Sequence, residues 1–196
     1  MNLLHRWLCS SSRWQQTVEK YVLPWTLEGL DLGSEVVEIG PGYGITTDLL
    51  RVKVAHLTCV EVDDRLAESL RRRTRDLNVT VRCEDATAMS LPDAAFDAAV
   101  CFTMLHHVPS PEHQDRLLAE VARVLRPGGI FAGTDSLDSR LLRLAHLFDT
   151  MVLIDPATFP DRLRAAGFQN VEVNVNPYAF RFRARKPLAA LAKAAA

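Results

Sequence analysis

Three acidic residues, Glu38, Glu61 and Asp85, lie in or just after three successive apolar stretches of the chain. A carboxylate accepts hydrogen bonds, so an acid at such a place can bind the hydroxyl groups of a ribose or the amino group of an adenine. Glu61 is predicted to bind the ribose and Asp85 the adenine, with helix capping and turn formation as the structural alternatives. Glu38 would repel a phosphate and favour a cation. The acids therefore favour an adenosine-like ligand with a positive end.

Two histidines, His106 and His107, follow a fourth apolar stretch and are the second group that could do chemistry. Imidazole changes charge near neutral pH, so a histidine beside a ligand can accept its proton as a general base. Packing or capping of the next segment is the alternative role for each ring. Four other histidines have no partner recognisable in the sequence and are expected to be structural: His5, His56, His113 and His146.

A glycine-rich turn follows Glu38 and contains Gly40, Gly42 and Gly44. Glycine lets the backbone adopt a positive φ and lets a ligand approach without a Cβ in the way. A dinucleotide fingerprint would place its third glycine at Ile45, so the spacing does not fit it. Pro41 has no N–H group with which to bind a pyrophosphate. The turn is thus predicted to bind a nucleoside that carries no phosphate.

A parallel β-sheet is expected to position these residues. Apolar stretches of strand length alternate with helical segments and short connections, which favours a doubly wound, Rossmann-like α/β fold with helices on both faces. Ligands bind such sheets at the carboxyl ends of the strands, where the acids and the histidine pair lie. The predicted strands are 36–39, 56–62, 79–83, 96–102 and 130–134. The predicted helices are 45–50, 64–75 and one that ends at Leu125, for which Ser110 is the expected N-cap and Pro111 lies in the first turn.

The C-terminal part has a different pattern. Segments 171–175 and 178–183 alternate strictly between apolar and polar residues, which predicts an antiparallel hairpin at the sheet edge. Two helices are expected before it, one around 139–150 and one capped by Asp155 that ends at Gly167.

The N-terminal residues 1–30 carry aromatic residues at helical spacing, and Pro24 is expected to end or kink the helix. These aromatic residues are predicted either to pack on the domain or to cover a ligand. In the second case Trp14 and Tyr21 are the candidates for facing a ligand cavity. The expected organisation is a helical cap over 1–30, one domain over 31–187 and a tail over 188–196.

Composition narrows the class of protein. The 196 residues contain 23 basic and 24 acidic side chains, so charge gives no argument for binding nucleic acid or an anionic membrane. No stretch is apolar enough to cross a bilayer and no signal peptide is recognised, which predicts a cytoplasmic protein. Cys59, Cys83 and Cys101 lie in apolar runs and are expected to be buried thiols, and no zinc-type spacing or magnesium-type acid cluster predicts a metal site.

Taken together, four signals resemble the motifs of class I S-adenosylmethionine-dependent methyltransferases. They occur in order between about residues 33 and 187. They are the glycine turn after Glu38, Glu61 after the second strand, Asp85-Ala86 after the third, and Phe96-Asp97 through His107 with Leu125-Arg126-Pro127-Gly128-Gly129. The resemblance implies a seven-stranded, mostly parallel sheet whose last strand is antiparallel, and S-adenosyl-L-methionine as cofactor.

The resemblance also implies roles for individual residues. The methionine part of the cofactor would lie against Glu38 and the glycine turn, the ribose against Glu61, and the adenine against Asp85 and Ala86. Cys101 and Phe102 would line the pocket near the transferred methyl group. The cofactor-binding set predicted on this basis is Glu38, Gly40, Gly42, Gly44, Glu61, Asp85, Ala86, Cys101 and Phe102.

The acceptor is predicted to be a small, rather apolar molecule. The segment after the fourth strand lacks the Asn-Pro-Pro-Tyr type of loop with which related enzymes bind a planar amino group, and no acids suit a metal-bound catechol. His106 or His107 is the predicted base if the acceptor has a proton to lose. Two alternatives stay open: a cofactor-binding partner subunit without turnover, and a nicotinamide dehydrogenase, which the glycine spacing disfavours.

Overall fold

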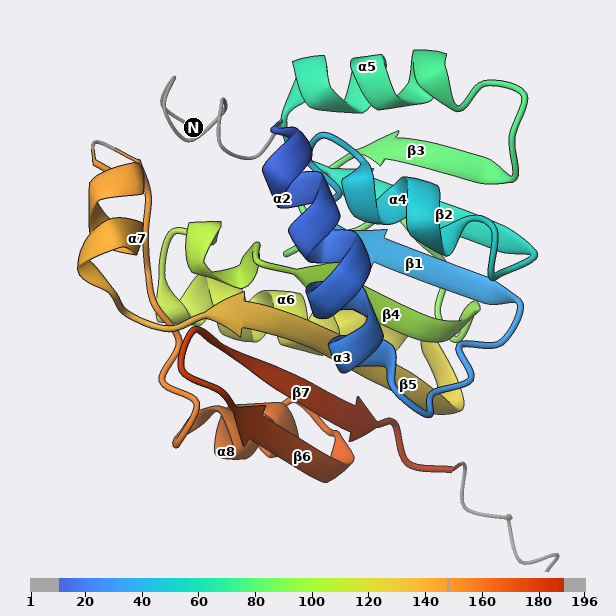
Figure 1. Cartoon of the computed structure of the whole chain (residues 1–196). Helices are drawn as coiled ribbons and strands as arrows, with labels where there is room; N and C mark the ends of the chain where they lie inside the picture. The colour runs from blue at the N-terminus through green and yellow to red at the C-terminus, as the bar shows by residue number, and fades with distance from the viewer. Residues whose placement is uncertain (1–10, 148, 189–196) are drawn as a thin grey trace, which may run out of the picture.

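In the computed structural model, which describes residues 11–147 and 149–188, the strands form a seven-stranded sheet (Figure 1). The strand order is β3-β2-β1-β4-β5-β7-β6, and β7 is antiparallel to both of its neighbours. The other paired strands are parallel. The predicted sheet, its antiparallel last strand and the C-terminal hairpin are confirmed. The strands are β1 Glu35–Ile39, β2 His56–Glu61, β3 Val79–Cys83, β4 Phe96–Phe102, β5 Leu125–Ser136, β6 Gln169–Val175 and β7 Ala179–Arg185.

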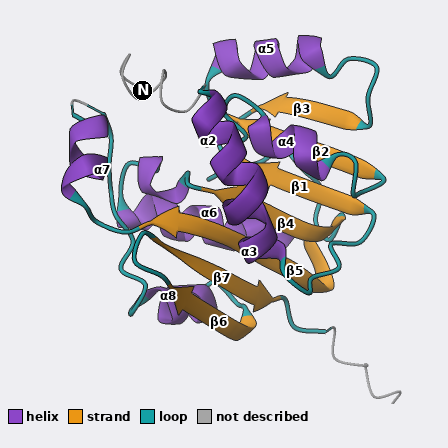
Figure 2. Ribbon diagram, in the orientation of Figure 1, coloured by secondary structure: helices purple, strands orange, loops and turns teal. Residues whose placement is uncertain are grey.

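Helices cover both faces of the sheet (Figure 2). On one face, residues of α3, α4 and α5 pack on the strands, and on the other face residues of α6 and α8 do so. None of the described helices is long and apolar enough to cross a membrane. The helical segments are α2 Ser12–Thr17, the π-helix η1 Val18–Val22, α3 Leu23–Leu27, α4 Ile45–Leu50, α5 Asp64–Arg73, the 3₁₀ turn η2 Leu105–His107, α6 Pro111–Val124, α7 Arg140–Ala145 and α8 Phe159–Ala165.

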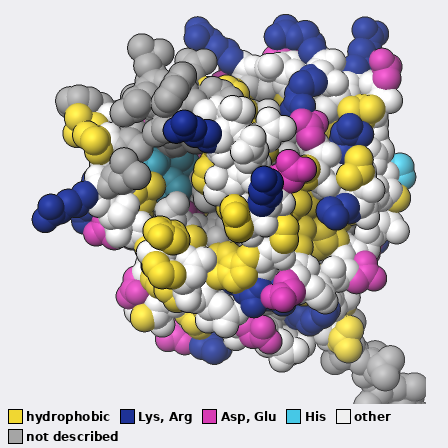
Figure 3. Space-filling model, viewed as in Figure 1, with side chains coloured by type: hydrophobic (Ala, Val, Ile, Leu, Met, Phe, Trp, Pro, Cys, Tyr) yellow, Lys and Arg dark blue, Asp and Glu magenta, His cyan; other side chains and the backbone are white. Residues whose placement is uncertain are grey.

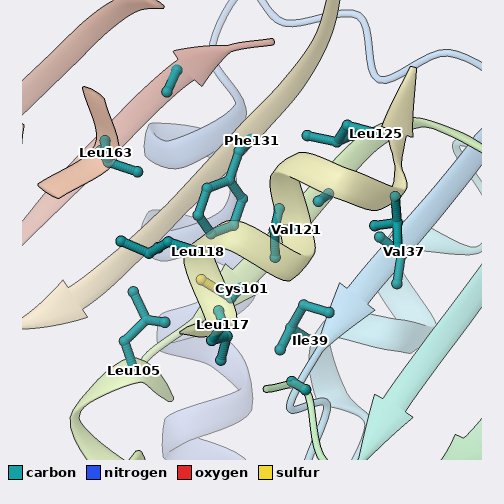
Figure 4. Close-up of a cluster of buried hydrophobic side chains, with 14 of the residues drawn as sticks. Val37, Ile39, Cys101, Leu105, Leu117, Leu118, Val121, Leu125, Phe131 and Leu163 are labelled. Atoms are coloured by element: carbon teal, nitrogen blue, oxygen red, sulfur yellow. The ribbon is translucent and has the colours of Figure 1, made fainter. Parts of the chain in front are cut away.

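Alternation along the central strands divides the core into two layers. Val36 belongs to the layer under α3, α4 and α5, whereas Val37 and Ile39 belong to the layer under α6 and α8. Figure 4 shows Ile39 close to Leu117 of α6 within the second layer. Because central parallel strands are covered on both faces, nearly every residue of β4 is buried, as its continuous apolar run predicts.

Asp97 fixes the ends of three strands at the edge opposite their carboxyl ends. Its Oδ2 atom accepts hydrogen bonds of 3.0 Å from the backbone N–H groups of Ser34 and Glu35. Its Oδ1 atom pairs with the guanidinium of Arg126 at the start of β5. The Phe96-Asp97 and Arg126-Pro127 motifs therefore meet in the structure and set the register of β1, β4 and β5.

The N-terminal helical segment continues past Pro24 instead of ending there. Proline donates no hydrogen bond and its ring collides with the carbonyl four residues earlier in a regular helix. Here the turn before Pro24 widens into the π-helix η1, and α3 follows without a break. The first ten residues of the predicted cap lie outside the described residues.

Three further predictions need correction. Cys83 is exposed on the edge strand β3, and its thiol donates to Asp64 Oδ1 at 2.8 Å. The helix expected around 139–150 is shorter, because α7 spans Arg140–Ala145. Asp155 accepts from the backbone of Ala157 in a separate turn, so α8 begins only at Phe159.

Candidate active site

A cavity of about 490 Å³ lies at the carboxyl ends of β1, β2 and β4. The glycine turn after β1, the segments after β2, β3 and β4, residues of α6 and the segment at Asp149 and Thr150 line it. Trp14 of α2, together with Val18 and Val22 of η1, lines it from the N-terminal segment. Figure 3 shows histidine side chains in a hollow between α2 and α7. The cavity therefore occupies the place where a doubly wound sheet binds its ligand.

The three glycines of the turn have positive φ values for different reasons. A Cβ at Gly42, which has φ of 56°, would meet no atom within 4 Å and would point into open space. A Cβ at Gly40 would lie 3.0 Å from Met104, and one at Gly44 would lie 2.6 Å from Leu70. Gly40 and Gly42 line the cavity, whereas Gly44 does not. Gly44 instead caps α4, which begins at Ile45, and lets α5 approach.

Glu61, at the end of β2, lines the cavity as predicted. Its Oε2 atom accepts a 2.9 Å hydrogen bond from the N–H group of Gly42, and its Oε1 atom accepts a 3.0 Å bond from Asp63. A carboxylate oxygen can accept more than one hydrogen bond, so both oxygens can still bind ribose hydroxyls. Asp63 itself caps α5, the role expected for an acid at this point. The assignment of Glu61 to the ribose stays a prediction.

Asp85 and Ala86, after β3, also line the cavity. Asp85 is exposed, and its Oδ1 atom accepts a 2.8 Å hydrogen bond from the backbone N–H group of Thr87. This bond is the turn-forming role that was the alternative for Asp85. The turn leaves the side chain at the rim, where its second oxygen remains able to accept from an adenine amino group.

Glu38 does not reach the cavity, so a direct contact with the cofactor's methionine part is not supported. Only 1% of the residue is exposed, and its two oxygens accept from the hydroxyl groups of Thr46 and Thr47, the latter at 2.6 Å. Burial raises the pKa of Glu38, while the two hydroxyl groups act in the opposite direction. Glu38 therefore fixes the first turn of α4, which follows the glycine turn.

The two residues predicted near the methyl group separate in the structure. Phe102, the last residue of β4, lines the cavity. Cys101 points into the layer under α6 and has no exposed surface (Figure 4). Burial raises the pKa of its thiol well above the ordinary range, and Asp135 raises it further. Cys101 is thus a core residue.

The charge of the cavity wall favours a cationic ligand. Five acids line it and, among the described residues, no lysine or arginine does. The charged side chains that a diphosphate would meet there are acids, which repel it, whereas a sulfonium or another cation is attracted. The wall therefore fits the phosphate-free nucleoside with a positive end that the acids and the glycine turn predict together. The acids are Glu61, Asp63, Glu84, Asp85 and Asp149.

The two predicted histidines have different positions. His107 lines the cavity, whereas His106 is 2% exposed and does not line it. The Nδ1 atom of His106 hydrogen-bonds to Asp135 Oδ1, and its backbone N–H group donates to Oδ2 of the same residue at 3.0 Å. The rings of His106 and His107 lie 4.2 Å apart between centroids. His107 is the ring that a ligand can reach, and His106 lies behind it.

Sequence reasoning missed two members of this cluster. Asp135 ends the apolar run of β5, so the rule that selected Glu61, an acid at the carboxyl end of a strand, would have found it. His146, classed as structural, comes from α7 and its following turn, and its Nε2 atom lies 3.1 Å from that of His106. His106 and His146 are forty positions apart, and no pattern in the sequence indicates that they meet.

Of the aromatic residues proposed to face the cavity, Trp14 lines it, but Tyr21 is 69% exposed and does not.

A family model described as a methyltransferase domain matches residues 37–133, the part of the chain from β1 to β5. The ubiquinone biosynthesis O-methyltransferase of Coxiella burnetii is 27% identical over 99 residues, which is 50% of this chain and 41% of that protein. The match therefore spans about two fifths of that relative's length.

Solved structures share the fold over more of the chain. A chain of the complex described as the Haloferax volcanii Trm112 methyltransferase activator with a methyltransferase candidate has a TM-score of 0.75 at 15% identity, and the match covers 95% of this chain and 99% of that one. The methyltransferase CalH, solved with S-adenosylhomocysteine, has a TM-score of 0.66 at 21% identity and covers 79% of this chain and 51% of its own. At these identities the likeness establishes the fold.

Proposed function

Because the chain belongs to the class I S-adenosylmethionine-dependent methyltransferase family, we propose that it transfers a methyl group to a small, largely apolar acceptor bound beside His107. The observation that carries this proposal is the cavity itself. It joins the glycine turn and Glu61 on one side to Phe102 and His107 on the other, and its charged side chains are acids.

The cofactor fits the part of the cavity nearest the glycine turn. Glu61 would accept from the ribose hydroxyls, and Asp85 with Ala86 would hold the adenine. The open space in front of Gly42 admits the methionine part close to the backbone. Glu38 supports this turn from beneath, through the two threonines of α4, and does not touch the ligand.

The acceptor fits the opposite part, between β4 and the N-terminal segment. Phe102, Met104 and Val108 supply apolar surface from the end of β4, and Trp14 and Val18 supply it from the N-terminal segment. An apolar molecule with one polar group is the ligand that such a wall prefers. The Coxiella burnetii relative is an O-methyltransferase, which supports an acceptor whose polar group is a hydroxyl.

The protein contributes to this reaction mainly by positioning the acceptor and the cofactor. When bound, S-adenosylmethionine supplies a methyl carbon already activated by a positive sulfur. With the cofactor bound, transfer of that methyl group to the acceptor oxygen would leave the carbon–sulfur bonding electrons on sulfur, and His107 would take the hydroxyl proton. The walls align the two reactants and exclude water.

A labelled-methyl assay tests the proposal. The protein is incubated with S-adenosylmethionine carrying a labelled methyl group and with panels of small phenols and alcohols, and methylated product is measured. The expected result is label on an apolar hydroxyl compound and a fall in kcat of about 100-fold or more in His107→Gln. His56→Gln, an exposed histidine on β2, is the control and should keep full activity.

Binding measurements separate this proposal from its rivals. S-adenosylhomocysteine is expected to bind, NAD is not, and Glu61→Ala should weaken S-adenosylhomocysteine binding about 10- to 100-fold. Binding without any methylated product across the panels would favour a partner subunit without turnover. Unchanged affinity in Glu61→Ala would show that the ribose assignment is wrong.

A further inference from the structure

We propose that His106, His107 and His146 together form a binding site for one transition-metal ion, with Zn²⁺ as the best-suited probe. One ring nitrogen from each of the three residues lies within 4.8 Å of the others. The three come from η2 after β4 and from the turn after α7, which the fold brings together at one corner of the cavity.

The hydrogen bonds of two rings aim their other nitrogens at a common point. A backbone carbonyl only accepts, so His146 donates from Nδ1 to Leu142 O, at 2.8 Å. Asp135 likewise holds the Nδ1–H group of His106. Metal-binding histidines are oriented in this way, with one ring nitrogen donating to a carbonyl or carboxylate and the other nitrogen bound to the metal.

The two Nε2 atoms that remain face one another at 3.1 Å. With hydrogens on both Nδ1 atoms, each Nε2 atom carries a lone pair that can bind a metal ion placed between them. Tetrahedral Zn²⁺ with bonds of about 2.0–2.1 Å holds neighbouring nitrogens roughly 3.4 Å apart, close to the observed separation. The pair is therefore spaced for a cation, and the buried Asp135 behind it adds a compensating negative charge.

His107 supplies the third ligand and the open side of the site. Its ring centroid lies 4.2 Å from that of His106 and 5.0 Å from that of His146. The ligand nitrogens of the three rings lie within 4.8 Å of one another, so binding would require this half-buried ring to move its nitrogen closer to the other two. Three imidazoles with one open position toward a cavity suit Zn²⁺, while Mg²⁺ and Ca²⁺ prefer oxygen ligands.

Metal binding would affect the proposed methyl transfer, and this consequence holds only if the proposed function is correct. The ring nitrogen of His107 that accepts the proton of the acceptor would be occupied by the metal. The two roles exclude each other, so a metal at the histidine cluster would inhibit transfer. The metal site itself stands on the geometry of the three rings and does not depend on methyl transfer.

Calorimetric titration with Zn²⁺ tests the site, using the full chain without a polyhistidine tag. We expect one ion per chain, and at least about tenfold weaker binding in His146→Ala and in His107→Ala, because each loses a ligand. Asp135→Asn should weaken binding roughly 10- to 100-fold, because it alters the partner that orients His106. His56→Ala removes an exposed histidine far from the histidine cluster and should bind as the wild type does.

Two further readouts make the outcome decisive. Co²⁺ should give the visible absorption of a tetrahedral site in the wild type and lose it in His146→Ala. Thermal unfolding of each metal-free variant shows whether it is folded, and an unfolded variant is replaced by the glutamine substitution at the same position. The proposal is overturned if Zn²⁺ does not bind at one ion per chain, or if both His146→Ala and His107→Ala bind it as tightly as the wild type. Because binding is measured without cofactor or acceptor, neither result depends on methyl transfer.

Discussion

At the scale of single residues, Glu38 shows how a buried acid can serve a site without touching the ligand. Both of its oxygens accept from threonine hydroxyls at the start of α4, and Cys59 lies 3.5 Å from one of them. Desolvation of the charged form would destabilise the fold, and the threonines offset part of that penalty. The order of the glycine turn thus depends on a hydrogen-bonded group inside the core.

The raised pKa of Glu38 gives a pH-dependent prediction for Glu38→Gln. A carboxyl whose pKa is raised on folding stabilises the folded state at low pH, and this stabilisation is lost as the pH rises through the folded-state pKa. The stability of the glutamine variant relative to the wild type should therefore improve from pH 4 to pH 8. Urea unfolding of both proteins at the two pH values measures the difference between their free energies of unfolding. Ionisable groups that both proteins share affect the two free energies equally and drop out of this difference. A difference independent of pH would contradict the raised pKa.

At the scale of elements, the N-terminal helical segment places one aromatic residue toward the cavity and another toward solvent. The π-helix η1 follows α2 and contains Val18 and Val22, which both line the cavity. Trp14 lines it one turn earlier, while Tyr21 is exposed. The segment is part of the cavity wall, and its extra backbone residue in the π-turn sets which side chains face inward.

Trp14→Ala and Tyr21→Ala form a matched pair that tests this wall. Removing the indole exposes apolar surface of the bound ligand, so the affinity for S-adenosylhomocysteine or for an identified acceptor should fall about 5- to 30-fold. Tyr21→Ala should leave both affinities unchanged, because its ring lies outside the cavity. Calorimetry measures the two affinities. Equal behaviour of the pair would mean that the segment only packs on the domain.

The contact between β5 and β7 depends on Gly133. A Cβ there would lie 2.5 Å from the carbonyl oxygen of Cys101 and 2.6 Å from the ring of Phe182. The backbone oxygen cannot move without breaking the β4–β5 ladder, so Gly133→Ala should lower the free energy of unfolding by roughly 2–4 kcal/mol. Gly29→Ala is the control: its Cβ would meet no atom within 4 Å, and its positive φ predicts a loss of about 1 kcal/mol. A smaller loss for Gly133→Ala than for the control would contradict this packing.

At the scale of the whole molecule, the cavity is lined by segments that lie far apart in the chain. The glycine turn, the ends of β2, β3 and β4, the N-terminal segment, α6 and the segment at Asp149 and Thr150 all contribute residues, and the two core layers hold them in place. A ligand that contacts all of these segments binds the folded state alone. Binding is therefore coupled to the stability of the whole domain.

Cofactor-dependent stabilisation follows from this coupling. At a concentration about 100 times its Kd, S-adenosylhomocysteine should stabilise the fold by about 2.7 kcal/mol, which corresponds to a rise in Tm of roughly 5–10 °C for a domain of this size. NAD at the same concentration should give no rise. Differential scanning calorimetry measures both. Glu61→Ala should shrink the rise, and a full rise in that variant would count against a ribose contact.

The amino-acid sequence by itself determined the order of strands and helices, the glycine turn and the places of Glu61, Asp85 and His107. These features depend on local properties: periodicity, turn chemistry and the rule that ligands bind at the carboxyl ends of parallel strands. The capping residue of α6, Ser110, and the antiparallel hairpin were predictable for the same reason. Each requires only a few neighbouring residues.

Only the tertiary structure decided which side chains reach the cavity. Glu38 and Cys101 have the sequence positions of site residues, yet the pleat of β1 and β4 directs both into the core. His146 joins His106 because the turn after α7 lies against η2, a contact between segments that no local pattern encodes. The direction of a side chain depends on strand pleating and on packing between distant segments, so a sequence pattern can place a residue at a strand end without settling what it faces.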